Sequence, residues 1–92
     1  MRILILLLLF LTACAPVQKQ VSLAYITNQG DDTVSVIDIH QNKVVSTIKV
    51  GKAPVGVAVS AKLQRVFISN VDSNNISVIN TQNNTVIKSI AL

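Results

Sequence analysis

The sequence predicts an all-β fold of antiparallel strands, and three observations carry this prediction. The chain repeats itself, because residues 25–50 align without a gap on residues 67–92, which lie 42 positions later. Short runs rich in Val, Ile and Thr fill both repeats, and clusters of Asn, Asp, Gly and Pro separate them. From residue 23 onward, no segment places apolar residues at sustained helical spacing. These features together favour one β unit that is built twice.

Seven strands are expected in order along the chain. The first repeat supplies the runs 23–27, 33–39 and 43–50, and the second supplies 55–60, 65–69, 76–80 and 85–92. The turns between them are too short for parallel crossovers, so neighbouring strands are expected to form antiparallel hairpins. Several strands carry apolar residues on both faces, as Val34, Val36, Ile37 and Ile39 do. We therefore expect each sheet to be covered on both sides by another sheet.

The two repeats agree closely in detail. Eight of the 26 aligned pairs are identical: Ile26/Ile68, Asn28/Asn70, Ser35/Ser77, Val36/Val78, Ile37/Ile79, Asn42/Asn84, Val44/Val86 and Ile48/Ile90. Substituted pairs keep their chemical class, as in Tyr25/Phe67 and Asp38/Asn80. Four strands in about 42 residues, with both faces covered, are typical of the blade of a β-propeller.

A known repeat has the same motifs. The stretches YITN (25–28), TVSVID (33–38), KVVSTIKVGKAPVGVAVS (43–60) and VFISN (66–70) resemble the YVTN-type propeller repeat of prokaryotic secreted and surface proteins. The resemblance covers residues 23–92 and implies that 54–60 is the innermost strand of a blade and 85–92 the outermost. It also implies a turn between blades at 51–54, where we expect Gly51 to use its freedom in φ and Pro54 to prevent pairing.

The chain contains about one and three quarter blades. Residues 23–50 form a predicted partial blade of three strands, and residues 51–92 a complete blade of four. A propeller has about four to eight blades, so a full ring of this type needs roughly 300 residues. We therefore expect an incomplete ring, from a truncated reading frame, a fragment, or a subunit that is completed by assembly. One blade face is expected to be open to water.

The first residues predict an exported lipoprotein. After Met1 and Arg2, the apolar run 3–11 would span about 14 Å as a helix, half of a ~30 Å hydrocarbon core, which is typical of a signal peptide. A buried strand or core helix is the other interpretation of this run. It ends in LTAC (11–14), which resembles the lipobox of bacterial lipoproteins. The resemblance implies that Cys14 is lipidated.

This resemblance divides the N-terminal residues. Residues 1–13 become a signal peptide, and residues 14–22 become the lipidated N-terminus and a tether. Cys14 is the only cysteine, so no intramolecular disulfide can form, and lipidation accounts for a lone thiol in an exported chain. Ala15 is not aspartate, which by the same resemblance implies anchoring in the outer membrane, facing the periplasm or the cell surface.

Other candidate sites have simpler interpretations. His40 is the only histidine and is expected to be a solvated turn residue. Asp31, Asp32 and Asp38 lack the spacing of a calcium-binding loop. The stretch GKAPVG (51–56) lacks the Gly-Lys-Ser/Thr ending of a phosphate loop, and no serine or threonine has an evident histidine base. We therefore expect no catalytic, metal or cofactor site.

The composition narrows the function further. The net charge is +4, but the basic residues are spaced singly and only three residues are aromatic, so nucleic-acid binding is not expected. The predicted function is a lipid-anchored binding or scaffolding module of the cell envelope, without catalysis. Its partners would be the membrane, through Cys14, and proteins or further copies of the chain, through exposed blade faces. The alternatives are a fragment of a periplasmic redox propeller with a haem or quinone cofactor, and a non-functional truncated remnant.

Overall fold

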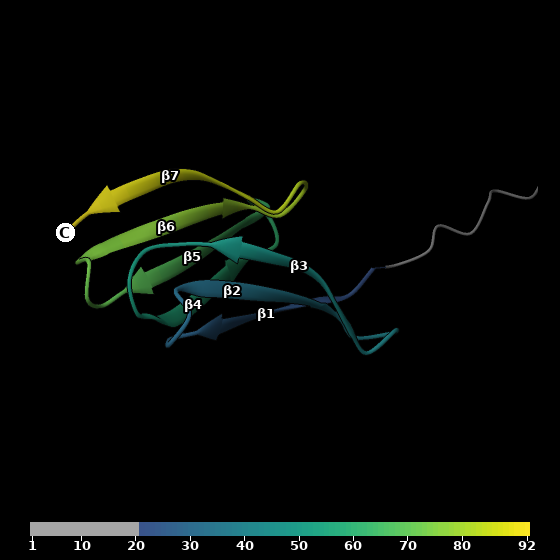
Figure 1. The fold of residues 1–92 in the computed structure, drawn as a ribbon. Helices are drawn as coiled ribbons and strands as arrows, with labels where there is room; N and C mark the ends of the chain where they lie inside the picture. The colour runs from purple at the N-terminus through teal and green to yellow at the C-terminus, as the bar shows by residue number, and fades with distance from the viewer. Residues whose placement is uncertain (1–20) are drawn as a thin grey trace, which may run out of the picture.

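The computed structural model describes residues 21–92, and this part of the chain forms seven strands and no helix (Figure 1). The strands are β1 (Leu23–Asn28), β2 (Thr33–Asp38), β3 (Lys43–Lys49), β4 (Pro54–Ser60), β5 (Arg65–Asn70), β6 (Asn75–Asn80) and β7 (Thr85–Ala91). Each boundary lies within one residue of the bounds expected from the sequence. The all-β prediction is therefore confirmed, and the described residues do not close a ring.

The strands form two antiparallel sheets that repeat each other. The first sheet has the order β1-β2-β3, and the second has the order β4-β5-β6-β7. Tyr25 pairs with Val36 in the first sheet, and Phe67 pairs with Val78 in the second. The register of the outermost strand shifts directly after Val36 in one sheet and directly after Val78 in the other. The 42-residue sequence repeat is therefore a structural repeat, down to its bulge.

The hairpin loops owe their shape to their last residue. Each of the five loops within the sheets ends on a residue with φ between 51° and 59°, namely Asp32, Asn42, Gln64, Asn74 and Asn84. Asn and Asp tolerate this left-handed conformation better than other non-glycine residues. Four of the five loops use one of these two residues, which explains why Asn is so frequent between the strands.

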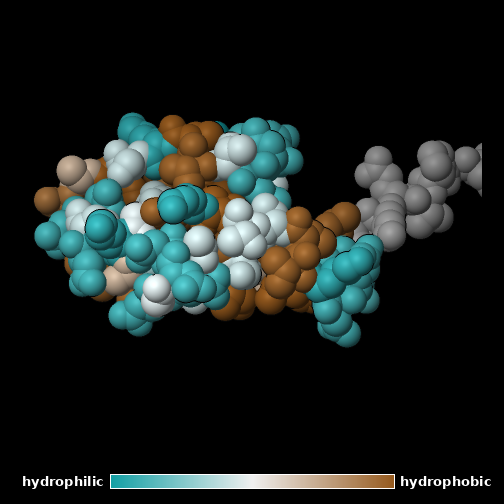
Figure 2. All heavy atoms as spheres, in the orientation of Figure 1, coloured by the Kyte–Doolittle hydropathy of each residue, from teal (hydrophilic) through white to brown (hydrophobic). Residues whose placement is uncertain are grey.

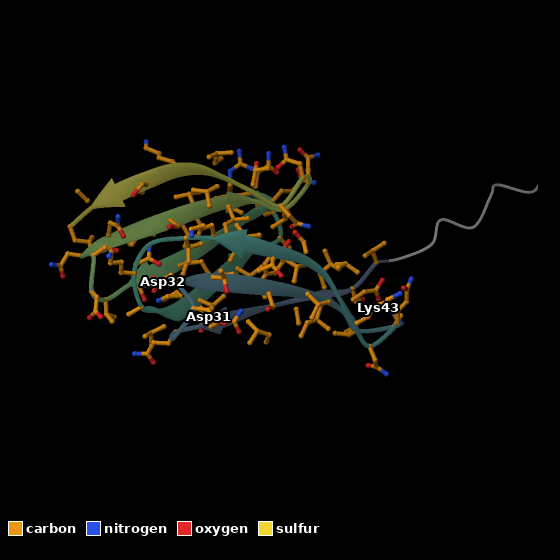
Figure 3. The ribbon with its side chains drawn as sticks, viewed as in Figure 1. Asp31, Asp32 and Lys43 are labelled. Atoms are coloured by element: carbon orange, nitrogen blue, oxygen red, sulfur yellow. The ribbon has the colours of Figure 1, made fainter. Side chains whose placement is uncertain are left out.

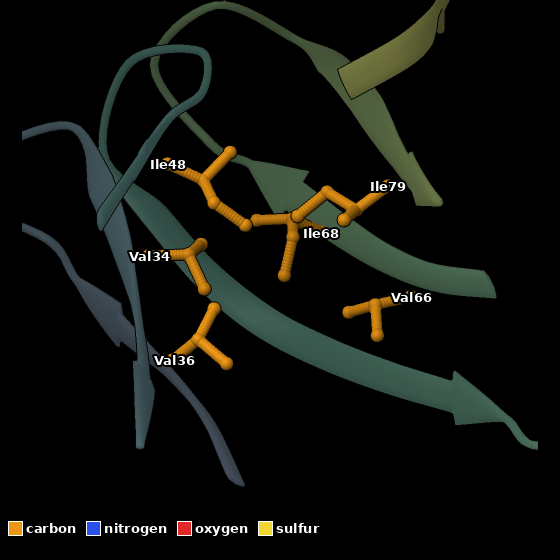
Figure 4. Packing of buried hydrophobic residues seen from close by; sticks show 6 residues of the cluster. All are labelled: Val34, Val36, Ile48, Val66, Ile68 and Ile79. Carbon is orange, nitrogen blue, oxygen red and sulfur yellow. The ribbon is translucent and has the colours of Figure 1, made fainter. Parts of the chain in front are cut away.

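The core lies between the two sheets. Val34, Val36 and Ile48 of the first sheet meet Val66, Ile68 and Ile79 of the second sheet, and all six are at most 5% exposed (Figure 4). Leu23, Tyr25 and Val50 pack against this cluster. The two sheets therefore stack face to face, as the apolar residues on both faces of the strands required.

Within residues 21–92 neither sheet is covered on both sides, so that expectation is wrong, whereas the open face expected of an incomplete ring is present. Each sheet has one covered face, and apolar residues of the other faces reach the surface. Figure 2 shows hydrophobic atoms exposed along β7 and around the ends of β1 and β2 that lie toward the N-terminus. Every residue of β7 is exposed. One covered face per sheet is the direct result of having two stacked blades in the described part of the chain.

The turn between the sheets differs from expectation in two respects. Gly51 does not adopt a positive φ, and Ala53 does, at 55°. Glycine is required at position 51 for space, because a Cβ there would lie 2.6 Å from Ser73 Oγ and 2.7 Å from side-chain atoms of Asn70. Pro54 does not prevent pairing, because it is the first residue of β4 and lies opposite Asn70 of β5, and the register shifts between Pro54 and Gly56.

Candidate functional site

The most distinctive surface is the face of the second sheet that points away from the first. Because side chains alternate across a strand, this face carries Phe67 and Ser69 of β5, Ile76 and Val78 of β6, and Ile90 of β7. We call these five residues the receiving face. Their counterparts in the first sheet are Tyr25, Thr27, Val34, Val36 and Ile48, which point at the second sheet.

The receiving face is apolar and incompletely covered. Ile48 is 5% exposed beneath the second sheet, whereas its counterpart Ile90 is 39% exposed. Val34 is fully buried, but its counterpart Ile76 is only half-buried. A pocket opens on this face, lined by Gly56, Val57, Ala58, Phe67, Ser69 and Ile76. Two positions that form the core in the first sheet, those of Val34 and Ile48, are therefore partly open to solvent in the second, whereas Val78 stays buried at 6% exposed.

The first sheet has an open face of its own, on the side away from the second sheet. It carries Ile26, Ser35 and Ile37, which we call the covering face. Ile26 is 46% exposed, whereas its counterpart Ile68 is fully buried against the first sheet. The molecule thus ends in two different apolar faces, one on each sheet.

An asparagine at the end of β1 and another at the end of β5 each hold their sheet together by side-chain hydrogen bonds. Asn28 Nδ2 donates to Thr33 Oγ1 and Ser35 Oγ, at 3.1 and 2.9 Å. Asn70 Nδ2 donates to Asn75 Oδ1 and Ser77 Oγ, both at 3.0 Å. Asn70 is 1% exposed, and its Oδ1 has no hydrogen-bond partner within the described part of the chain. These bonds explain why Asn and Ser are identical between the repeats.

A side-chain hydrogen bond joins the two sheets. The Tyr25 hydroxyl on β1 donates to Asn84 Oδ1, in the β6–β7 hairpin, at 2.7 Å. Burial raises the pKa of the Tyr25 phenol above its ordinary value of 10.0. The bond lies beside a hollow of about 600 Å³ between the ends of the sheets, which is lined partly by Leu23 and Val59. Phe67, the counterpart of Tyr25, has no hydroxyl.

The polar groups noted in the sequence serve the turns. His40 is exposed, and its backbone N–H donates to Asp38 Oδ1 at 2.9 Å, which agrees with the expected turn role. Asp32 Oδ1 accepts the Ala53 N–H at 2.9 Å and so joins the first sheet to the turn between the sheets. Figure 3 shows Asp31 and Asp32 at the opposite end of the first sheet from Lys43. Across residues 21–92, no three His, Cys, Asp or Glu side chains gather in a way that could hold a metal ion.

Three backbone amides of the stretch 51–56 donate to side-chain oxygens, and that of Ala53, bonded to Asp32, is described above. The Lys52 N–H donates to Ser73 Oγ at 2.9 Å, and the Gly56 N–H donates to Ser69 Oγ at 2.9 Å. Phosphate loops instead leave several amides pointing at the ligand. These contacts support the interpretation of this stretch as a turn between blades.

Cys14 and the predicted signal peptide lie outside the described residues, so their predicted roles stay predictions. Where the structure describes the chain, it contains no helix that is both long and apolar enough to cross a membrane.

Comparisons with known proteins bear on the fold. No family model matches the chain. A hydrazine synthase from Kuenenia stuttgartiensis has a similar structure, with a TM-score of 0.74 and 28% identity over 77% of this chain. The two sheets are β-propeller-like blades. The match covers 20% of the hydrazine synthase chain.

A sequence relative covers less of the chain. A stretch of 36 residues is 58% identical to the PE-PGRS family protein PE_PGRS18 of Mycobacterium tuberculosis (strain ATCC 25618 / H37Rv). It represents 39% of this chain and 8% of that protein. The chain thus spans a small part of both proteins, and the resemblances to YVTN repeats and to lipoproteins stay predictions.

Sequence reasoning missed two features of the blades. It noted Asn28/Asn70 and Ser35/Ser77 as identical pairs without a reason, although polar identity in a β repeat points to a shared hydrogen bond. It also missed the bond between Tyr25 and Asn84, which lie 59 positions apart. No local signal marks that pair, because the contact exists only once the blades are stacked.

Proposed function

We propose that the chain is a lipid-anchored propeller-repeat module of the bacterial cell envelope, which binds or scaffolds other proteins through its open blade faces and performs no catalysis. The observation that carries the binding role is the contrast between Ile48, buried at 5%, and Ile90, exposed at 39%. An apolar surface of this kind on a folded unit marks a site of interaction. The sequence LTAC at 11–14 supports the anchor.

The distribution of polar groups supports binding over catalysis. Apart from Asn84, which accepts the Tyr25 hydroxyl between the sheets, the described aspartates and asparagines that form side-chain hydrogen bonds hold turns or strand ends, as Asp38 and Asn70 do. His40, the one histidine, lies exposed in a hairpin loop with its backbone bonded to Asp38. A general base or nucleophile needs a partner within hydrogen-bond reach. The exposed apolar side chains of the open faces instead support a role in binding.

The similarity to a hydrazine synthase favours one alternative, a fragment of a periplasmic redox propeller. The match covers 20% of that protein, so its activity is not carried over with the fold. A redox role would require axial histidines or a C-x-x-C-H site, and the sequence has one histidine and one cysteine. Saturable binding of haem or a quinone by the full chain would favour this alternative over the proposal.

The anchor is tested by labelling bacteria that express the full chain with radioactive palmitate. The chain should take up label, and Cys14→Ser should abolish the uptake, because the thiol of Cys14 is the proposed acceptor. A matched control adds Ser22→Cys to Cys14→Ser and should stay unlabelled, because a lipobox does not precede position 22. Equal labelling of Cys14→Ser and the unmutated chain would refute the anchor.

A further inference from the structure

We propose that the receiving face of one chain binds the covering face of a second copy, so that the chains associate head to tail. The proposal deepens the proposed function, because it names the partner of the open blade faces. It rests on the propeller-like stacking of the two sheets and is independent of the lipid anchor.

The molecule already contains the contact that we infer. In each chain, Val34, Val36 and Ile48 are buried by Val66, Ile68 and Ile79. Moving 42 positions along the repeat converts the first set into Ile76, Val78 and Ile90, which belong to the receiving face. The internal interface is thus a template for what covers the receiving face.

The second half of the template is also present on the chain. Three of the residues that cover the first sheet, Ile68, Ser77 and Ile79, have the counterparts Ile26, Ser35 and Ile37. All three pairs are identical, and together the counterparts form the covering face. A second copy therefore offers the same side chains in the same register at these three positions. The counterpart of Val66 is the smaller Ala24, and the first sheet has no strand equivalent to β4. This match favours a second copy over an unlike protein.

One residue of the receiving side departs from the template. Lys88 on β7 pairs with Val78 and so lies on this side of the sheet, where the first sheet has Ser46. Lys88 is exposed on the outermost strand. A lysine at such a position can keep its ammonium in water while its methylene groups lie along the apolar surface. The substitution therefore does not place a charge in the centre of the contact.

The geometry also fixes which residues should meet between copies. The hydroxyl of Tyr25 contacts Asn84 within the chain. The same step along the repeat places Phe67 of one copy beside Asn42 of the next. Asn42 is exposed in the β2–β3 hairpin, and it shares the left-handed backbone of Asn84, with φ of 55° and 57°. Because the two faces differ, the association is head to tail and either closes into a ring or continues as a filament.

Cross-linking between two tagged full chains tests this arrangement. Both chains carry Cys14→Ser, one also carries Phe67→Cys, and the other also carries Asn42→Cys. A short bifunctional maleimide should join the two into a mixed covalent dimer in coexpressing cells. In the control, Val71→Cys replaces Phe67→Cys. Val71 is 50% exposed in the turn that follows β5, and the three residues from Phe67 to the end of β5 alone span about 10 Å, so the yield of mixed dimer should fall sharply.

A pair of lysine variants tests whether the mixed dimer depends on the receiving face or on the apolar surface in general. Adding Ile90→Lys to the Phe67→Cys chain places a charge in the proposed contact and should lower the yield about tenfold or more. Leu63→Lys is the matched control, because Leu63 is 60% exposed outside both faces and should leave the yield unchanged. Circular dichroism of each variant shows whether the strands are retained.

Each outcome decides the question. A mixed dimer that depends on Ile90 and not on Leu63 supports the head-to-tail contact. Absence of the mixed dimer in folded chains, or its capture by an unlike protein instead, overturns the second copy as partner. Palmitate labelling of the Cys14 chain is measured separately, so failure of this proposal and failure of the lipid anchor are distinguishable.

Discussion

At the scale of single residues, the identical pairs of the repeat divide into two kinds. Apolar identities such as Val36/Val78 fill equivalent positions on a sheet face, and the alternating pattern predicts them. Polar identities such as Asn28/Asn70 make equivalent hydrogen bonds across a hairpin. The sequence alone reveals that such residues matter, but their bonding depends on side-chain geometry that only the folded hairpin defines.

Tyr25 provides a prediction about alkaline stability. Burial raises its pKa in the folded chain above the value of 10.0, so the folded state holds the phenol proton more tightly than the unfolded state does. The contribution of Tyr25 is fully present below pH 10 and is lost as the pH rises through the folded pKa. Ionisation also removes the proton that the hydroxyl donates to Asn84.

The measurement compares urea unfolding of the full chain with that of Tyr25→Phe between pH 7 and pH 11. At pH 7 the variant should lose about 0.5–1.5 kcal/mol, the net value of one hydrogen bond. The difference between the two chains should shrink above pH 10. No matching variant is needed in the second sheet, because Phe67, the counterpart of Tyr25, has no hydroxyl. A difference that stays constant across the whole range would contradict the role of Tyr25.

At the scale of elements, strand positions were predictable because local chemistry determines them. Runs of β-branched residues end where Asn or Asp adopts the left-handed conformation, as at Asn42 and Asn84. The role of Gly51 was not predictable in the same way. Its neighbours Asn70 and Ser73 lie some 20 residues away in the sequence, and their approach becomes visible only after β4 pairs with β5.

Gly51 and Gly30 form a matched pair for testing this junction. In Gly51→Ala, the new Cβ would lie 2.7 Å from atoms of the buried Asn70 side chain, which is held by two hydrogen bonds. We expect a loss of about 1–3 kcal/mol in the free energy of unfolding, typical of overpacking. Gly30→Ala meets nothing within 4 Å and should be neutral or slightly stabilising. Thermal unfolding of both variants is the measurement, and equal effects would show that space at position 51 is not limiting.

At the scale of the whole molecule, the sequence predicted stacked blades and an open face, but not which residues the face exposes. Which residues are exposed depends on which face of each sheet packs against the other sheet. Ile48 becomes core and Ile90 becomes surface, although they are the same residue at the same place in their repeats. Identical local sequence thus acquires different energetic roles, because a blade's stability depends on its neighbours.

The last prediction uses this asymmetry to strengthen the proposed association. Phe67 should lie beside Asn42 of the next copy, as Tyr25 lies beside Asn84 within the chain. Phe67→Tyr adds the hydroxyl that the internal contact has, and one hydrogen bond is worth about 0.5–1.5 kcal/mol. Association of the full chain, followed by native mass spectrometry across a dilution series, should therefore tighten about two- to tenfold. Asn42→Gly keeps the left-handed backbone open to residue 42 but removes the acceptor, so in the double variant the gain should disappear. If Phe67→Tyr tightens association equally with and without Asn42, the hydroxyl has a different partner and the register between copies is not the one that the repeat implies.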